Sequence, residues 1–200
     1  MAISLRRDVV VSRVFPALIF VSLWLDGWFF PLILLPFLYV FLVEKKDAQW
    51  LGFQKQKSKL SIYLGMLVSV FLMVTYIPVF LYYFSLTDKQ FPSVFDVFTD
   101  VIWYPFYEEA TYRSFFLVHF AVFDYSSLSK RNLSVNLLQS LLFLSIHGHH
   151  LTSSTPLVLV PVFFLALLNG FLFLRTRNII GCLLSHCVIN SFAWSLRVIL

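Results

Sequence analysis

Apolar residues fill most of the chain and are interrupted only by short polar segments. Five apolar segments have about the length of a membrane-spanning helix, roughly 17–25 residues. A sixth stretch is too long for one straight span and contains Asp26-Gly27 near its middle, so we expect two short helices or a re-entrant pair there. The segments cover about residues 14–43, 60–84, 99–122, 134–150, 156–174 and 178–198. This pattern predicts an all-α, polytopic transmembrane helical bundle of about seven membrane helices, the first two short or re-entrant.

Composition supports a membrane protein without a second, soluble domain. Hydrophobic residues make up 60% of the 200 residues and charged residues 12%, whereas soluble domains contain about 25% charged residues. We therefore expect one membrane domain in two parts. Residues 1–98 hold N-terminal membrane helices and a basic loop, and residues 99–200 hold a membrane core with the polar motifs described below.

The net charge of +5 comes from basic residues clustered between apolar segments. This distribution indicates topology signals and contacts with membrane lipids, and we expect no nucleic-acid partner. If residues 14–43 form a hairpin, twelve of the fifteen basic residues fall on one side of the membrane, which predicts a cytoplasmic N-terminus. These twelve are Arg6, Arg7, Arg13, the five lysines of residues 44–59, Lys130, Arg131, Arg175 and Arg177.

Three ionisable residues lie within six positions of one apolar segment, namely Glu108, Glu109 and Arg113. Each costs about 2.5–3.5 kcal/mol at the bilayer centre on the insertion scale, so such residues are usually paired or functional. Glu109 and Arg113 are four residues apart and can form an ion pair on one helical face. Glu108 lies roughly 140° around the helix from Arg113. The spacing predicts that Arg113 neutralises Glu109 and that Glu108 is available as a base.

Two further apolar segments carry side chains suited to catalysis. Phe143 and His147 are one helical turn apart in one segment, and His186 and Asn190 are four residues apart in the last segment. A carboxylate with a neutral histidine can orient a water, take its proton and later protonate the leaving amine. A histidine and an asparagine on one helical face can donate hydrogen bonds to a developing oxyanion. Together these groups favour hydrolysis of a peptide bond.

The three motifs, in this order and inside apolar segments, resemble those of the CAAX-protease and bacteriocin-processing family, also called the Abi family. This family of intramembrane glutamate peptidases includes the Ras-converting CAAX endopeptidase. The resemblance covers about residues 100–195. The motifs read Glu108-Glu109-x-x-x-Arg113, Phe143-x-x-x-His147 and His186-x-x-x-Asn190.

The resemblance implies an intramembrane endopeptidase that cleaves a membrane-associated or hydrophobic protein or peptide, which can be lipidated. It implies Glu108 and His147 as the pair that activates water, and His186 and Asn190 as the pair that binds the oxyanion. It also implies an integral protein of a bacterial or archaeal cytoplasmic membrane. The supporting residues are Glu109, Arg113 and Phe143.

Three alternatives stay open at this point. Many family members are labelled metalloproteases, and Glu108, His147 and His186 would then be zinc ligands. The chain has no HExxH motif, and we favour a mechanism without a cofactor. A second alternative is a non-catalytic immunity or scaffold protein of the same fold. A third is an ion-coupled transporter that uses the three charges of the first motif, although the other apolar segments carry few charges to continue such a path.

Overall fold

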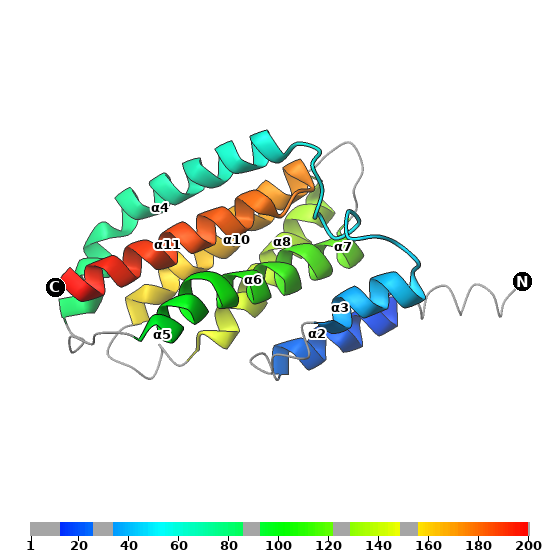
Figure 1. Ribbon diagram of the computed structural model, residues 1–200, viewed down its shortest axis with the longest axis horizontal. Coiled ribbons are helices and arrows are strands. Elements are labelled where there is room, and N and C mark those ends of the chain that lie inside the picture. The colour runs from blue at the N-terminus through cyan, green and yellow to red at the C-terminus, as the bar shows by residue number, and fades with distance from the viewer. Residues whose placement is uncertain (1–12, 26–33, 86–92, 122–128, 149–155, 200) are drawn as a thin grey trace, which may run out of the picture.

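The computed structural model describes residues 13–25, 34–85, 93–121, 129–148 and 156–199. These residues are mostly helical, and they contain no β-strand, which confirms the predicted all-α class. The helices run side by side along the long axis of the molecule (Figure 1). Their bounds are α2 Phe15–Leu25, α3 Leu34–Leu38, η3 Tyr39–Val43, α4 Ser58–Ser85, α5 Val94–Phe98, η4 Thr99–Trp103, α6 Tyr104–Glu108, η5 Glu109–Phe116, α7 Leu117–Phe120, α8 Lys130–Ile146, η6 Pro156–Val158, α10 Leu159–Thr176 and α11 Ile180–Ile199.

Several of these helices indicate an integral membrane protein. Within the described residues, three are long and apolar enough to cross a bilayer, namely Ser58–Tyr83, Pro156–Thr176 and Ile180–Ile199. The apolar stretch at about residues 14–43 contains two shorter apolar helices, Phe15–Trp24 and Leu34–Val43, instead of one long helix. The turn expected at Asp26-Gly27 lies outside the described residues. Since the remaining helices are shorter or more charged, the count of seven membrane crossings stays a prediction.

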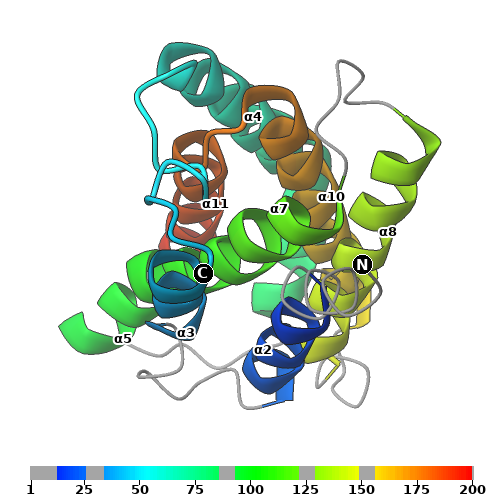
Figure 2. The ribbon, with the colours of Figure 1, turned by 90° about the vertical axis from the view of Figure 1, so that its right-hand side faces the viewer.

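The segments from α5 to α7 form one continuous helix that carries the first motif. Ser93 and Asp96 begin it with a capping box, in which each side chain accepts a hydrogen bond from the other residue's backbone N–H. Two parts, η4 and η5, are wound as π-helix rather than α-helix. In Figure 2 this helix runs obliquely across the view, below α11 and above α2, and it contacts α2, α8, α10 and α11. The first motif is thereby surrounded by helices from both halves of the chain.

Neighbouring helices approach closely at two glycines. A Cβ atom on Gly181 of α11 would lie 2.0 Å from the carbonyl oxygen of Ser61 in α4. A Cβ atom on Gly170 of α10 would lie 1.7 Å from Asn136 Oδ1 of α8. Such small residues let membrane helices approach closely enough for dispersion and polar contacts to hold them together.

The contact between α4 and α11 gives a stability prediction. Gly181→Ala is expected to lower the free energy of unfolding by about 1–3 kcal/mol, because the added methyl group forces the two backbones apart. Thermal unfolding in detergent measures this effect. Ser195→Ala, at an exposed position of the same helix, is expected to change stability by less than about 0.5 kcal/mol. Equal stability of the two variants would contradict the close packing.

Candidate active site

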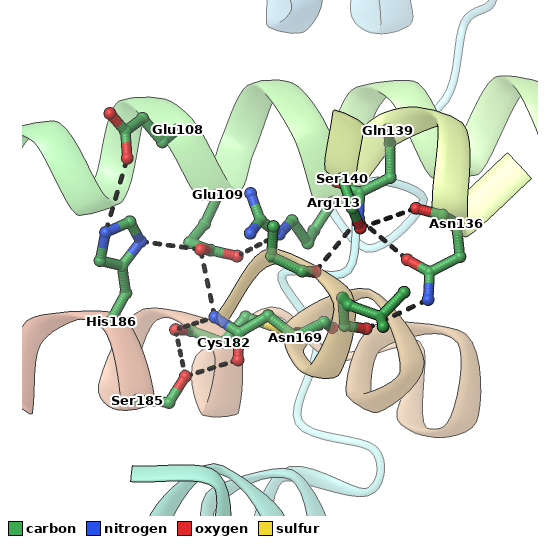
Figure 3. A network of polar contacts seen from close by, with 12 residues as sticks. Glu108, Glu109, Arg113, Asn136, Gln139, Ser140, Asn169, Cys182, Ser185 and His186 are labelled. Carbon is green, nitrogen blue, oxygen red and sulfur yellow. Dashed lines mark hydrogen bonds and ion pairs between the residues drawn. The ribbon is translucent and has the colours of Figure 1, made fainter. Parts of the chain in front are cut away.

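Glu109 lies at the centre of a buried polar network (Figure 3). Its Oε2 atom is 3.1 Å from Arg113 Nε, and both side chains are fully buried. The other oxygen, Oε1, accepts hydrogen bonds from Asn169 Nδ2 at 3.2 Å and from His186 Nδ1 at 2.8 Å. The ion pair predicted from the four-residue spacing is confirmed. Three polar groups from three helices thus surround one carboxylate.

The imidazole of His186 bridges both glutamates of the first motif. Its Nδ1 atom donates to Glu109, and its Nε2 atom is 3.5 Å from Glu108 Oε2. With the proton on Nδ1 held by the Glu109 carboxylate, Nε2 of the neutral ring presents its lone pair toward Glu108. A single proton can therefore be shared between Glu108 and His186.

This bridge differs from the expectation that Glu108 would lie apart from the ion pair. The helix changes from α-helical to π-helical winding between Glu108 and Glu109. An angle calculated for an ideal α-helix does not hold across such a junction. His186 approaches from α11 and contacts both adjacent carboxylates.

Phe143 connects the three motifs. Its ring centroid is 4.5 Å from Arg113 Cζ, 4.8 Å from the His147 ring and 6.1 Å from the His186 ring. The guanidinium therefore lies against an aromatic face, a favourable place for a buried cation. His147, at the C-cap of α8, donates from Nδ1 to the Phe143 carbonyl oxygen at 3.0 Å. This hydrogen bond fixes the tautomer of the neutral ring and makes Nε2 its acceptor.

The four candidate catalytic side chains line one cavity of about 270 Å³. Glu108 comes from α6, His147 from the end of α8, and His186 and Asn190 from α11. Asn190 Nδ2 donates to the carbonyl oxygen of Asp100 at 2.7 Å, which holds its amide on the cavity wall. The rest of the lining is largely apolar and includes Leu72, Phe80, Val162, Leu165, Ile189 and Ala193. Such a cavity can accommodate an apolar ligand group together with a few polar atoms.

Comparison with protein families agrees with this geometry. A family model described as Rce1-like, type II CAAX prenyl endopeptidase Rce1-like, matches residues 90–192, which is more than half of the chain and includes all three motifs. The chain belongs to this family. The resemblance found in the sequence is thereby confirmed, and membership in a family of CAAX endopeptidases implies a protease. No curated protein and no solved structure matches the chain.

Sequence reasoning missed one residue of this candidate site, Asn169 of α10. Its amide is fully buried, donates to Glu109 and accepts from Ser185 Oγ at 2.6 Å. Asn169 Nδ2 also donates to the Cys182 carbonyl oxygen at 3.2 Å. An asparagine within the apolar run of residues 156–174 was a detectable signal, since polar residues inside membrane helices usually pair with one another.

Asn169 gives a prediction about positioning. Asn169→Leu is expected to lower kcat about tenfold to a hundredfold, because Glu109 and His186 lose a fixed neighbour and small misplacements are costly. We expect KM to stay unchanged and Asn169→Gln to restore part of kcat. Asn136→Leu removes an equally buried amide that bonds to Leu167 and Gln139 instead, and it serves as the control. Equal kcat losses in both variants would indicate a general packing role.

The zinc alternative requires Glu108, His147 and His186 to converge as ligands. Across the part of the chain that the structure describes, no three histidine, cysteine, aspartate or glutamate side chains are grouped as metal ligands. His186 Nδ1 faces Glu109, and its Nε2 lies 3.5 Å from Glu108 Oε2. A mechanism without a cofactor stays a prediction, and no step below passes through a metal.

Proposed function

We propose that the protein is an intramembrane endopeptidase that hydrolyses a peptide bond of a membrane-associated or hydrophobic protein or peptide. The observation that carries this proposal is the single cavity lined by Glu108, His147, His186 and Asn190. Beneath it, the buried pair of Glu109 and Arg113 holds His186 in place. Membership in the CAAX-endopeptidase family supports the same reaction class.

Glu108 and His147 are the groups we propose to activate water. Burial beside apolar side chains limits the water in this cavity, so a reacting water needs fixed partners. The carboxylate of Glu108 takes the proton of the water, and His147 Nε2 orients it. The same proton then passes to the leaving amine. General base and acid catalysis of this kind contributes about 10²–10⁴-fold in rate.

His186 and Asn190 are the proposed donors to the oxyanion. Because Glu109 accepts the Nδ1 proton of His186, donation from Nε2 requires a second proton on the ring. The contact with Glu108 at 3.5 Å offers a route by which the proton taken from water passes to Nε2 while negative charge develops on the substrate, and then returns through Glu108 to the leaving amine. The imidazolium would then be stabilised by two neighbouring carboxylates. Loss of one such donor typically costs about 10²–10³-fold in kcat.

Substrate access follows from the placement of the cavity. It is lined by the second half of α11, including Asn190 and Trp194, whereas the basic loop of residues 44–57 packs beside the start of α11. If that loop is cytoplasmic, as its charge predicts, the site opens toward the opposite face. A cysteine introduced at either Val94 or Lys55 tests this in a Cys187→Ser background, in which the remaining native cysteine, Cys182, is fully buried. An impermeant maleimide should label only Val94→Cys in intact cells, and the reverse pattern would contradict this orientation.

The function is tested with purified protein in proteoliposomes and a fluorogenic hydrophobic peptide, with and without a lipid group. We expect cleavage by the unmodified protein, also after treatment with a metal chelator. His147→Ala should lose activity, while His119→Ala keeps it, because His119 pairs with Glu44 outside the cavity. Full activity of His147→Ala would reject the assignment. Activity lost to the chelator and restored by zinc would favour the metalloprotease alternative.

A further inference from the structure

A second cavity, which we call the basic cavity, lies on the loop side of the bundle and has a volume of about 720 Å³. Four cationic residues and one acidic residue contribute to its wall. The cationic residues are Lys45, Lys46, Lys57 and Arg177, and the acidic residue is Asp47. Asp47 Oδ1 accepts a hydrogen bond from the backbone N–H of Gln49 at 3.1 Å, so this carboxylate is already engaged by the loop. The cavity therefore presents mainly positive charge.

The wall of the basic cavity is held by hydrogen bonds to backbone carbonyl oxygens between two distant segments. The Ile179 N–H donates to the Gly52 carbonyl oxygen at 3.1 Å, and Gln54 Nε2 donates to the Arg177 carbonyl oxygen at 2.6 Å. Asn178 Nδ2 donates to the Gln56 carbonyl oxygen at 3.2 Å. Loop and turn are thus fixed to each other before any ligand binds, which reduces the entropic cost of binding.

Three of the cationic residues occupy a backbone conformation that favours glycine. The φ angles of Lys45, Lys57 and Arg177 are 55°, 56° and 56°. Long side chains at left-handed positions carry a steric cost, and such positions often accompany functional sites. Burial also lowers the pKa of Arg177 to about 10, so it stays charged at neutral pH. An anion in the cavity would offset the cost of bringing these cations together.

The Trp50 ring completes the basic cavity at the level where the membrane helices end. Lys46 Nζ is 3.3 Å from the Trp50 ring centroid, and Arg177 Cζ is 5.7 Å from the same centroid. Arg177 follows the last residue of α10, and Lys57 precedes the first residue of α4. Both helices are candidate membrane spans. Tryptophan beside lysine and arginine is typical of the headgroup region of a bilayer.

We propose that the basic cavity binds the phosphate of an anionic lipid headgroup from the leaflet that contacts the loop. The shared chemistry is a phosphate anion, which inorganic phosphate or a lipid could supply. The position at the span ends and the exposed Trp50 ring beside the cations favour the lipid, because its glycerol and acyl chains continue along α4 and α10. This site is separate from the proposed peptidase reaction.

The test uses the full-length protein in nanodiscs of phosphatidylcholine with a trace of phosphatidylglycerol. Native mass spectrometry after extraction counts the phosphatidylglycerol molecules retained. We expect one tightly held molecule in the unmodified protein and about tenfold weaker retention in Lys46→Gln/Lys57→Gln. The control Lys59→Gln/Lys130→Gln removes the same charge from exposed positions outside the basic cavity and should retain the lipid.

Three results would overturn the proposal. The first is equal loss in both double variants, which would indicate net charge rather than a site. The second is the same retention of phosphatidylcholine as of phosphatidylglycerol. The third is that Lys46→Gln/Lys57→Gln still retains the lipid while millimolar inorganic phosphate is found to bind at the same lysines. This would assign the cavity to a free anion. Thermal unfolding of both double variants verifies that each is folded.

Discussion

Glu108→Gln is expected to lower kcat for peptide cleavage by about 10³–10⁴-fold, the upper range for loss of a general base. Glutamine has nearly the same size and can still hydrogen-bond, but it cannot accept a proton from water. The side chain is buried and lies 3.5 Å from His186 Nε2, so no bulk solvent replaces its function. Steady-state kinetics in proteoliposomes measure the change.

The matched control for this substitution is Glu44→Gln. Glu44 lies 3.1 Å from His119 Nε2 and outside the candidate cavity, so it offers another glutamate paired with a histidine. Its kcat should stay within about twofold of the unmodified protein. A kcat loss below tenfold in Glu108→Gln, with the protein folded by its melting temperature, would remove Glu108 from the reaction.

Arg113→Met is expected to lower the free energy of unfolding by about 3–5 kcal/mol, the typical cost of breaking a buried ion pair from one side. The Glu109 carboxylate would then be fully buried without its cation, whereas the replacement fills a similar volume against Phe143. Equilibrium unfolding in mixed micelles provides the measurement.

The double variant Glu109→Gln/Arg113→Met distinguishes a charge effect from lost packing. With both charges gone, most of the stability is expected to return, because neutral partners do not leave a buried charge uncompensated. His186 Nδ1 and Asn169 Nδ2 can still donate to the glutamine oxygen at the position of Glu109 Oε1. Additive losses in the two single variants and the double variant would contradict a coupled pair.

Local sequence features predicted much of this molecule. Apolar segments at about 60–84 and 156–174 correspond to α4 and to η6 with α10, because length and hydropathy decide membrane helices. The pair of Glu109 and Arg113 also follows from local spacing, since residues four apart share a helical face.

Contacts between distant segments could not be predicted from the sequence. The position of Asn169 beside Glu109 depends on how α10 packs against η5, and the bridge from His186 depends on the approach of α11. The helix also changes to π-helical winding after Glu108. The angle between Glu108 and Arg113 that was calculated for an ideal α-helix therefore does not apply. The basic cavity joins the 44–57 loop to Arg177, more than a hundred residues away, and charge clustering alone does not specify such a pairing.

Single-turnover cleavage in ¹⁸O-labelled water tests the role of Glu108 most directly. With enzyme in excess over peptide, mass spectrometry of the new C-terminal carboxylate and of the Glu108 peptide follows the label. If Glu108 acts as a base on water, the product carries one ¹⁸O after its first turnover and Glu108 carries none. Unlabelled product together with ¹⁸O on Glu108 would show a covalent intermediate and contradict the account.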